Sequence, residues 1–367
     1  MSYLAGIDRI GSAGLAGRKC AFLTNSAALS RDGRRAVEAA MDAGVRLVRL
    51  LSPEHGLDLR AAEGVHVSSG KDSATGLPVS SLYDGSRDVS PGVFEGVDTV
   101  LVDLPDVGVR YFTYADALFR MMDACASTGR DLVLLDRANP LGRTLEGPLL
   151  EMRHASDVGR FPVPVRHGMT LGEYAILAME RFGVAPGLRF TVVPPLFSIS
   201  SADSCFLDFG CAWTAPSPNL NSFEALCCYP GTCLFEGTNL SEGRGTETPF
   251  QLVGAPFVES NAILAALEGC SFPGLELAPA TFTPKSGKHA GDTCHGVKFS
   301  VRDARRCRAF EAALRVLDAA RRLFPEFSFK AEHFDHLLGS QGFRLGTESL
   351  ESLLSRAESE CATFKQK

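Results

Sequence analysis

The sequence predicts an α/β protein that begins with a doubly wound parallel sheet and continues into a second, less regular α/β part. Over the first 150 residues, short and almost continuously apolar runs alternate with helical patterns, as is typical of parallel strands buried on both faces. The chain has 367 residues, which suggests about two domains. We expect these domains to cover residues 1–155 and 156–367, although no obvious linker marks the boundary.

The individual elements follow from hydrophobic period and capping residues. Apolar runs predict strands at 19–24, 45–51, 77–83, 99–103, 131–136, 189–193 and 296–301. Helical patterns predict helices at 30–43, with Ser30 as N-cap, and at 114–127, 303–324 and 347–360. Thr170 and Glu173 form a capping box that opens another helix. Residues 197–256 are interpreted as loop-rich because prolines recur there.

Polar side chains follow four of the predicted strands. They lie in the segments 24–25, 53–56, 103–110 and 136–139, and they include Asn25 and Asn139. In a parallel sheet, ligands bind beyond the carboxyl ends of the strands, so these segments are expected to meet at one site.

Composition excludes several classes of protein. With 43 acidic and 37 basic residues the net charge is −6, and no basic run indicates a nucleic-acid partner. No dinucleotide or nucleotide glycine motif is present, and the eleven cysteines show no repeated zinc-ligand spacing. We therefore expect neither cofactor nor metal. The amino terminus does not resemble a signal peptide and no apolar run is long enough to span a membrane, so a reduced, cytoplasmic protein is expected.

Glu54 is the first candidate for catalysis. It follows a buried strand, where a partly desolvated carboxyl group can act as a general acid; the equally weighted alternative is a turn cap or an ion pair. His55 orients Glu54, binds substrate or is structural. Asp106 precedes Arg110, whose guanidinium suits a carboxylate. Asp103 is expected to form an internal ion pair with an arginine that fixes this loop.

Further candidates have polar groups suited to a saccharide or an anion. Tyr111 and Tyr114 offer flat faces with hydroxyl groups, and Asn219 is one of the amides near the single tryptophan. Arg166 and His167 precede the predicted helix N-terminus at Thr170, which makes an anion-friendly corner.

The glycine-rich run 229–246 is the most distinctive segment of the chain. It has neither a helical nor a strand period, and we expect little of it to pack in a core. It is interpreted as a binding wall in which Glu236, Asn239, Glu242 and Arg244 face a ligand, in preference to a surface turn. Two carboxylates on opposite sides of a site suit cleavage of a glycosidic bond, although composition does not select a sugar over another polar substrate.

Seven segments together resemble the exo-β-N-acetylmuramidase family, long grouped as a domain of unknown function. In chain order they are residues 53–56 (Pro-Glu-His-Gly), 106–114, 136–142, 146–148, 164–173, 216–219 and 229–245. The run Glu-Gly-Thr-Asn-Leu-Ser-Glu-Gly-Arg-Gly at 236–245 is the most specific of them, and the resemblance extends from about residue 5 to 350.

This resemblance implies a Rossmann-like first domain, a smaller second domain, and release of N-acetylmuramic acid from the non-reducing end of peptidoglycan fragments. The family glutamate falls on Glu54. The second acidic residue is Glu242, Glu236 or Asp106. Arg110, Arg166 and His167 are then candidates to bind the lactyl carboxylate of muramic acid. Such a substrate is a small saccharide, with no nucleic-acid or membrane partner.

Two other functions remain open from the sequence. One is a carbohydrate-binding protein without catalysis. The other is a different hydrolase on the same scaffold, acting on an amide or an ester.

Overall fold

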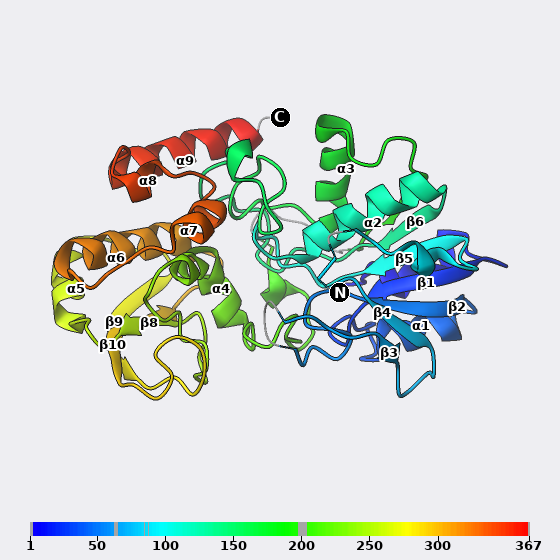
Figure 1. Cartoon of the computed structure of the whole chain (residues 1–367), viewed down its shortest axis with the longest axis horizontal. Helices are drawn as coiled ribbons and strands as arrows, with labels where there is room; N and C mark the ends of the chain where they lie inside the picture. Colours follow the sequence, from blue (N-terminus) through cyan, green and yellow to red (C-terminus); the bar gives the residue numbers. More distant parts are fainter. Residues whose placement is uncertain (1–2, 62–64, 84, 87, 197–203, 366–367) are drawn as a thin grey trace. The chain divides into compact units, whose positions relative to one another are not determined.

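The computed structural model describes residues 3–61, 65–83, 85–86, 88–196 and 204–365 (Figure 1). The chain forms two compact units, each assembled from several segments. Unit 1 contains Met1–Gly108, Phe112–Gly142 and Met169–Pro218, and unit 2 contains Val109–Tyr111, Arg143–Gly168 and Asn219–Lys367. The division of the chain into domains 1–155 and 156–367 stays a prediction.

Unit 1 is built on a seven-stranded sheet, which confirms the Rossmann-like fold. The strand order is β3-β4-β2-β1-β5-β6-β7, and every neighbouring pair is parallel except β3 with β4. The strands are β1 (Lys19–Thr24), β2 (Arg46–Ser52), β3 (Gly70–Lys71), β4 (Pro78–Ser81), β5 (Thr99–Asp103), β6 (Asp131–Leu135) and β7 (Phe190–Val193). The central strands β5 and β6 are buried along their whole length, which explains their continuous apolar runs.

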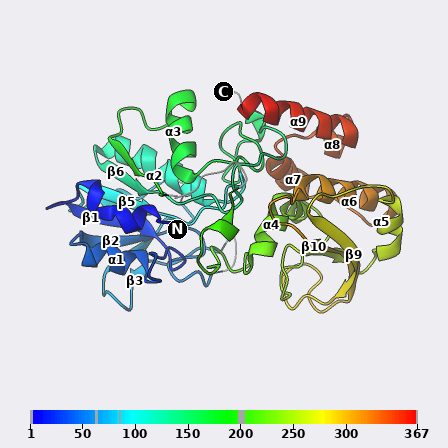
Figure 2. The ribbon, with the colours of Figure 1, turned by 180° about the vertical axis from the view of Figure 1, so that it is seen from behind.

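Helices cover the sheet on both faces. The 3-10 helix η1 (Gly6–Ala13) and α1 (Ala36–Asp42) pack on one face, in a core that includes Phe22, Leu50 and Leu101. Because side chains alternate along a strand, the strand residues next to these core residues point to the other face of the sheet. On that face α2 (Tyr114–Thr128) packs against β6 and against α3 (Leu171–Phe182). Figure 2 shows the same unit from behind.

The predicted helix at 30–43 is shorter than expected. It begins at Ala36 with Arg35 as N-cap, so the prediction of Ser30 as the cap is wrong. Ser30 instead closes a turn, because its amide donates to the carbonyl of Arg34 (2.9 Å) and its hydroxyl donates to Asp32 (2.5 Å). A residue that can cap a helix can equally well satisfy a local turn.

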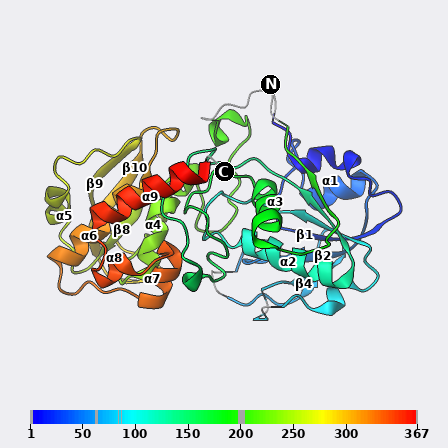
Figure 3. The same ribbon diagram turned by 90° about the horizontal axis from the view of Figure 1, so that it is seen from above.

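Unit 2 contains a three-stranded antiparallel sheet of order β8-β10-β9. Its strands are β8 (Leu252–Ala255), β9 (Leu275–Phe282) and β10 (Cys294–Val301), and its helices are α4 (Phe223–Thr232), α5 (Ser260–Ala266), α6 (Ala309–Leu323), α7 (Ala331–Leu338), α8 (Gly342–Leu345) and α9 (Leu350–Lys365). Helix α4 packs against β10 and α6, and α9 lies against α6 (Figure 3). Short 3-10 helices occur at Pro91–Phe94, Met152–His154, Phe206–Asp208 and Cys233–Gly237.

The glycine-rich run is more ordered than predicted. Its first half belongs to α4 and to the 3-10 helix η5 (Cys233–Gly237), and most of its residues are buried, so the expectation that little of it packs in a core is wrong. The glycines serve close packing here. A Cβ on Gly231 would lie 2.1 Å from the carbonyl oxygen of Ala309, and one on Gly237 would lie 2.6 Å from the Cα of Phe334. Of the stretch 197–256, residues 197–203 lie outside the described part.

In the described part of the chain, every helix is too short or too polar to cross a bilayer.

Candidate active site

The carboxyl ends of four adjacent parallel strands bring together the predicted polar residues of unit 1. Strands β2, β1, β5 and β6 are neighbours in that order, so Glu54, Asn25, Asp106 and Asn139 follow strands that end at one edge of the sheet. Arg110, which was expected at the same edge, belongs to unit 2. The sheet topology thus groups Glu54 and Asp106, the two catalytic candidates of the first unit.

Glu54 is held by the start of helix α2. Its side chain is half-buried, and Oε2 accepts a hydrogen bond from the Thr113 hydroxyl (2.6 Å). The next residue, Tyr114, is fully buried; its hydroxyl donates to the Pro216 carbonyl (2.6 Å) and accepts from the Asn25 amide (2.6 Å). Burial, and after it the charge of Glu54, raises the pKa of Tyr114 well above its ordinary value. Tyr114 therefore stays a neutral phenol within reach of the charge of Glu54.

Asp106 is the second carboxyl group at this edge. Only 8% of it is exposed, and its Oδ2 accepts a hydrogen bond from the amide of Gly108 (2.9 Å). Its Oδ1 is buried and has no hydrogen-bond partner among the described residues. Burial raises the pKa of Asp106 to about 7. This carboxyl group can therefore gain or lose a proton near neutral pH.

His55 and Asn139 fix the backbone around these carboxyl groups. His55 has a positive φ of 68°, and its Nδ1 donates to the carbonyl of Ala61 (2.9 Å). Asn139 accepts from the Leu141 amide (2.9 Å) and donates to the Met169 carbonyl (3.0 Å). Both side chains are buried. These contacts favour structural roles, and binding of substrate by either residue stays a prediction.

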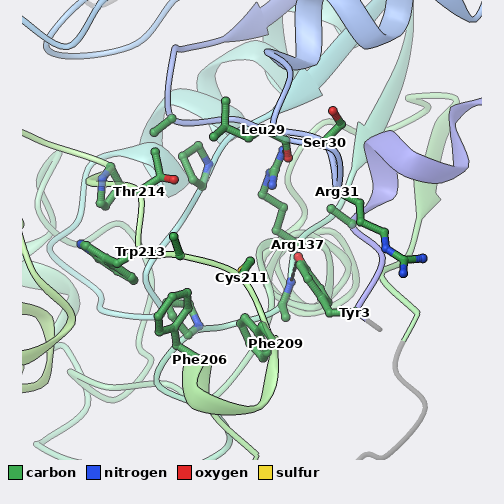
Figure 4. Close-up of a pocket in the computed structure, with 18 of the residues that line it drawn as sticks. Tyr3, Leu29, Ser30, Arg31, Arg137, Phe206, Phe209, Cys211, Trp213 and Thr214 are labelled. Carbon is green, nitrogen blue, oxygen red and sulfur yellow. Dashed lines mark hydrogen bonds between the residues drawn. The ribbon is translucent and has the colours of Figure 1, made fainter. Parts of the chain in front are cut away.

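A pocket of about 620 Å³ opens beside Asp106 within unit 1 (Figure 4). We call it the aromatic pocket. Its lining includes the aromatic residues Tyr3, Phe206, Phe209 and Trp213, together with polar groups of Ser30, Arg137 and Asp106. Arg137 lies in the middle of the residues drawn in Figure 4, below Leu29 and Ser30 and beside Tyr3. The volume falls within the range of small-molecule sites.

The guanidinium of Arg137 is bound to Asp103. Its Nε and Nη2 donate to the two oxygens of that fully buried carboxylate, and Nη2 also donates to the Leu29 carbonyl (2.9 Å). The expected internal ion pair of Asp103 with an arginine is therefore present, and the arginine is Arg137. The prediction did not use Arg137, although it stands in the Asp-Arg-Ala-Asn segment that carries the resemblance.

Arg110 is enclosed in unit 2. Its Nη1 donates to the carbonyls of Pro148 and Val163 (2.8 Å each), and its Nη2 donates to those of Leu337 and Leu338 (2.9 Å each). Only 2% of the residue is exposed. The observed contacts favour a structural role, and recognition of a lactyl carboxylate stays a prediction.

Three other predicted site residues of unit 2, Tyr111, Arg166 and His167, are also buried. The Tyr111 hydroxyl donates to the carbonyls of Tyr229 and Pro230. Arg166 pairs with Glu146 (2.7 Å) and donates to the carbonyl of Cys307. Burial, and after it the charge of Arg110, lowers the pKa of His167 to about 3. The imidazole is thus neutral at physiological pH, which weakens its case as an anion ligand.

The polar residues of the glycine-rich run form an ion-pair network in unit 2. Arg244 pairs with Glu236 (2.6 Å) and Glu242 (3.2 Å), and Lys288 pairs with Glu242 (2.9 Å). Burial acts to raise the pKa of Glu236, but Arg244 and His333 outweigh it and hold that pKa at about 2. Glu236 is therefore ionised, as an electrostatic stabiliser must be. Both carboxylates nevertheless have their charge balanced by a neighbouring cation.

Two predicted residues of unit 2 lie in other surroundings. Asn239 accepts from the amide of Ser328 (2.9 Å) and donates to the carbonyl of Glu326 (2.8 Å), which ties the run to the segment before α7. Asn219 is half-buried next to the start of α4. Substrate binding by either residue stays a prediction.

Sequence reasoning missed Thr113 as the partner of Glu54 and did not see that Trp213 faces a pocket. Thr113 lies in a segment that was singled out, but a hydroxyl group one residue before a helix carries no signal of its own. Among the described residues, no group of three or more histidine, cysteine, aspartate or glutamate side chains is arranged to hold a metal ion.

A Rossmann-like sheet with two carboxyl groups at its ligand-binding edge defines an α/β enzyme that can use acid–base chemistry of its own side chains. Comparison with known proteins identifies the family. The chain belongs to the exo-β-N-acetylmuramidase NamZ family of glycosidases: the N-terminal family model matches residues 20–224 and the C-terminal model matches residues 227–367. The family indicated by the sequence motifs is thereby confirmed.

Individual relatives agree with this assignment. The chain is 36% identical, over 359 residues, to the peptidoglycan β-N-acetylmuramidase NamZ of Bacillus subtilis, covering 96% of this chain and 86% of that protein. A crystal structure of a DUF1343 family protein from Bacteroides fragilis superposes with a TM-score of 0.89 at 24% identity, covering 99% of this chain and 97% of that one. A second such protein from the same organism has a TM-score of 0.77 at 28% identity, covering 100% and 97%.

Proposed function

We propose that the protein removes N-acetylmuramic acid from the non-reducing end of peptidoglycan fragments, with Glu54 as the general acid. The observation that carries this proposal is the position of Glu54: it stands at the carboxyl edge of the parallel sheet, oriented by Thr113, in a chain 36% identical to a peptidoglycan β-N-acetylmuramidase. Strand-end carboxyl groups of such sheets lie where ligands bind.

The proposed chemistry needs two carboxyl groups. Glu54 donates its proton to the glycosidic oxygen while the bond between that oxygen and the anomeric carbon breaks, and the leaving sugar departs as a neutral alcohol. A water oxygen then becomes bonded to the anomeric carbon, and its proton returns to a carboxylate. The net reaction is hydrolysis, so no other reactant is required.

Asp106 is the best supported partner among the three candidates. Its Oδ1 makes no hydrogen bond with any described residue, and a pKa of about 7 allows the group to exchange a proton near neutrality. Glu236 and Glu242 are engaged by Arg244 and Lys288. Such ion pairs are more typical of a structural or electrostatic role.

The decisive variant is Glu54→Gln, which keeps the shape of the side chain but cannot donate a carboxylic proton. We expect kcat on a chromogenic N-acetylmuramide to fall roughly 10²–10⁴-fold, with unchanged folding. Glu95→Gln, at an exposed glutamate of the same unit, is the matched control and should keep wild-type turnover. Near-normal turnover by Glu54→Gln would reject the role of Glu54.

The substrate class is tested separately with the wild-type protein. It should hydrolyse the muramide and leave the corresponding N-acetylglucosaminide intact. Binding of muramic acid without turnover would instead identify a carbohydrate-binding protein. Release of a peptide or acyl group from a muramyl disaccharide, with the sugar linkage intact, would identify a different hydrolase.

We also propose that the protein works in the cytoplasm on fragments brought into the cell. All eleven cysteines are free thiols, and eight of them are buried. Such a set is typical of a reducing compartment. Cell fractionation tests the location, and recovery of the protein outside the cytoplasmic membrane would contradict it.

A further inference from the structure

The acid–base chemistry proposed above makes no use of most of the aromatic pocket. The pocket lies where the strand order of the sheet reverses: β1 has β2, the next strand of the chain, on one side and β5 on the other. Its lining comes from residues 3–8, the loop after β1, the turns after β5 and β6, and residues 206–216. In open α/β sheets such a switch point is a preferred ligand site.

The pocket does not have the chemistry of a nucleotide site. A dinucleotide fold places the pyrophosphate on a helix that opens with glycines directly after β1. Here β1 ends at Thr24 and α1 begins only at Ala36. The lining carries the carboxyl groups of Asp8, Asp32 and Asp106 together with the guanidinium groups of Arg31 and Arg137, so opposite charges are mixed in it. A neutral ligand fits this balance better than a phosphate or a free carboxylate.

Two pairs of aromatic side chains form walls of the pocket. Tyr3 and Phe209 stack with ring centroids 4.8 Å apart, and Phe206 meets Trp213 edge to face at 5.0 Å. Aromatic faces bind the apolar side of a pyranose ring, while hydroxyl and amide groups of the same ring need polar partners. The pocket supplies both kinds of surface.

Two polar groups are available at its base. Asp106 Oδ1 is buried without a hydrogen-bond partner among the described residues. Arg137 uses Nε and Nη2 for Asp103 and Leu29, which leaves Nη1 without a hydrogen bond inside the described structure. One acceptor and one donor thus remain for a ligand that enters the pocket.

Hydrogen bonds of two adjacent residues, Thr113 and Tyr114, link the proposed acid and the pocket wall. Pro216 lines the pocket, and its carbonyl accepts from the hydroxyl of Tyr114. Thr113, the residue before Tyr114, donates to Glu54. Glu54 does not itself line the pocket, but these contacts tie the pocket wall to the segment that holds the proposed proton donor, at the same edge of the sheet. A general acid must lie beside the leaving group that it protonates.

We propose that the aromatic pocket is the subsite for the leaving sugar, a neutral N-acetylamino sugar bonded to the terminal muramic acid. This inference rests on the proposed function and adds the substrate unit that follows the scissile bond. The ring packs on the aromatic walls, and its polar groups bond to Arg137 Nη1. The mixed charges of the lining suit this neutral unit.

Direct binding is the first test, because Trp213 is the only tryptophan of the chain and lines the pocket. Titration with methyl N-acetyl-β-glucosaminide should change the intrinsic fluorescence in a saturable way. The expected Kd lies in the millimolar range, which corresponds to a binding free energy of about −4 kcal/mol. The control Leu207→Ala changes an exposed residue that does not line the pocket, and it should titrate like the wild type. Absence of a saturable signal overturns the proposal.

Kinetics distinguish a leaving-sugar subsite from any other sugar site. Phe206→Ala removes a wall ring one residue before the control position. We expect it to lower the ratio of kcat/KM for a muramyl disaccharide over that for a muramyl fluoride, whose leaving group is a single atom, by about 10-fold. Leu207→Ala should leave both values unchanged.

The other kinetic outcomes are equally clear. Equal losses on both substrates would place the muramic acid itself in the pocket, and an unchanged ratio would mean that no sugar of the substrate uses it; either result overturns the proposal. If the wild type cleaves neither substrate, the proposed function fails. A saturable fluorescence change would then still support a sugar site, but the leaving-sugar assignment would be overturned.

Discussion

Two aspartates three residues apart show how the surroundings of a single side chain decide its chemistry. Asp103 ends strand β5 fully buried, and the guanidinium of Arg137 balances its charge. Asp106 is almost as buried but accepts only backbone amides, so burial dominates and raises its pKa to about 7. Both residues follow the same strand and read alike in the sequence. Burial raises the pKa of Asp103 as well, but Arg137 opposes that rise and holds the carboxyl group in an ion pair, whereas Asp106 has no such partner.

The first prediction concerns the pH dependence of stability through Asp106. The folded protein keeps a proton on this group up to about pH 7, whereas an unfolded chain releases it near the ordinary pKa of 3.8. The free energy of unfolding should therefore fall as the pH rises from about 4 to 7. The difference between the two pKa values corresponds to about 4 kcal/mol at most.

The variant Asp106→Asn removes this titration and keeps an acceptor for the Gly108 amide. We expect Asp106→Asn to become progressively more stable than the wild type between pH 5 and pH 8 in urea unfolding. The exposed Asp58→Asn is the control. A stability difference that does not change with pH would show that Asp106 is ionised in the folded state across this range.

At the scale of elements, the N-terminus of α3 joins a helix cap to a buried carboxylate. The capping box predicted at Thr170 and Glu173 is confirmed: the Thr170 hydroxyl accepts from the Glu173 amide (3.2 Å), and the Glu173 carboxylate accepts from the Thr170 amide (2.8 Å). The same hydroxyl donates to Asp136 (2.7 Å), just past β6. One threonine therefore fixes both the start of α3 and its place against the sheet.

Thr170→Ala removes this hydroxyl. The loss of the N-cap alone should lower the free energy of unfolding by about 1–2 kcal/mol. The loss of a donor to the buried Asp136 should lower it further. Urea unfolding measures this loss. Glu180→Ala, at an exposed position of the same helix, should change stability little. An equal effect of both variants would show that the cap does not position α3.

Helix α4 shows why the glycine-rich run was misinterpreted as a loop. The run from Tyr229 was predicted to be a loop because it combines proline and glycine, yet it continues the helix past Pro230. At Gly231 the helix packs so closely on α6 that a Cβ would meet the carbonyl of Ala309 at 2.1 Å and the Cβ of Ala313 at 2.8 Å. Tertiary packing, which no local pattern encodes, sets the residue type here.

The corresponding variant is Gly231→Ala. We expect it to destabilise the protein by about 1–3 kcal/mol, the range for overpacking, although alanine has the higher intrinsic helix propensity. Thermal unfolding provides the measurement. Gly11→Ala is the control, because open space surrounds that position in η1. Stabilisation by Gly231→Ala would show that α4 and α6 are not in such close contact.

At the scale of the whole molecule, the first unit was more predictable than the second. All seven predicted strands occur, and 19–24 and 99–103 match β1 and β5 at both ends, because buried parallel strands have nearly continuous apolar runs. The sequence missed β3, β8 and β9. Strand β3 has only two residues, and β9 contains a proline and alternates weakly.

The candidate site was predicted only in part, for a physical reason. Strand topology brings Asn25, Glu54 and Asp106 to one edge of the sheet, and the apolar pattern was enough to predict this. Side-chain partners depend on contacts between distant segments, as between Thr113 and Glu54. The same limit applies to Arg110: a charged residue beside tyrosines suggests a ligand, whereas its actual partners are carbonyls from residues 148 to 338.

The last prediction asks what Arg110 does for the molecule. Four backbone carbonyls from three distant segments of unit 2 converge on this one side chain, and Arg110→Met would leave all of them buried without these donors. Each unsatisfied buried group costs about 1–3 kcal/mol, so we expect a loss of several kcal/mol in urea unfolding. Arg153→Met, at an exposed arginine of the same unit, should have little effect. At temperatures where the variant stays folded, a structural role predicts a wild-type KM for the muramide, because the pocket keeps its ligand groups. A variant as stable as the wild type but with a KM raised 10-fold or more would instead identify Arg110 as the group that binds the substrate carboxylate.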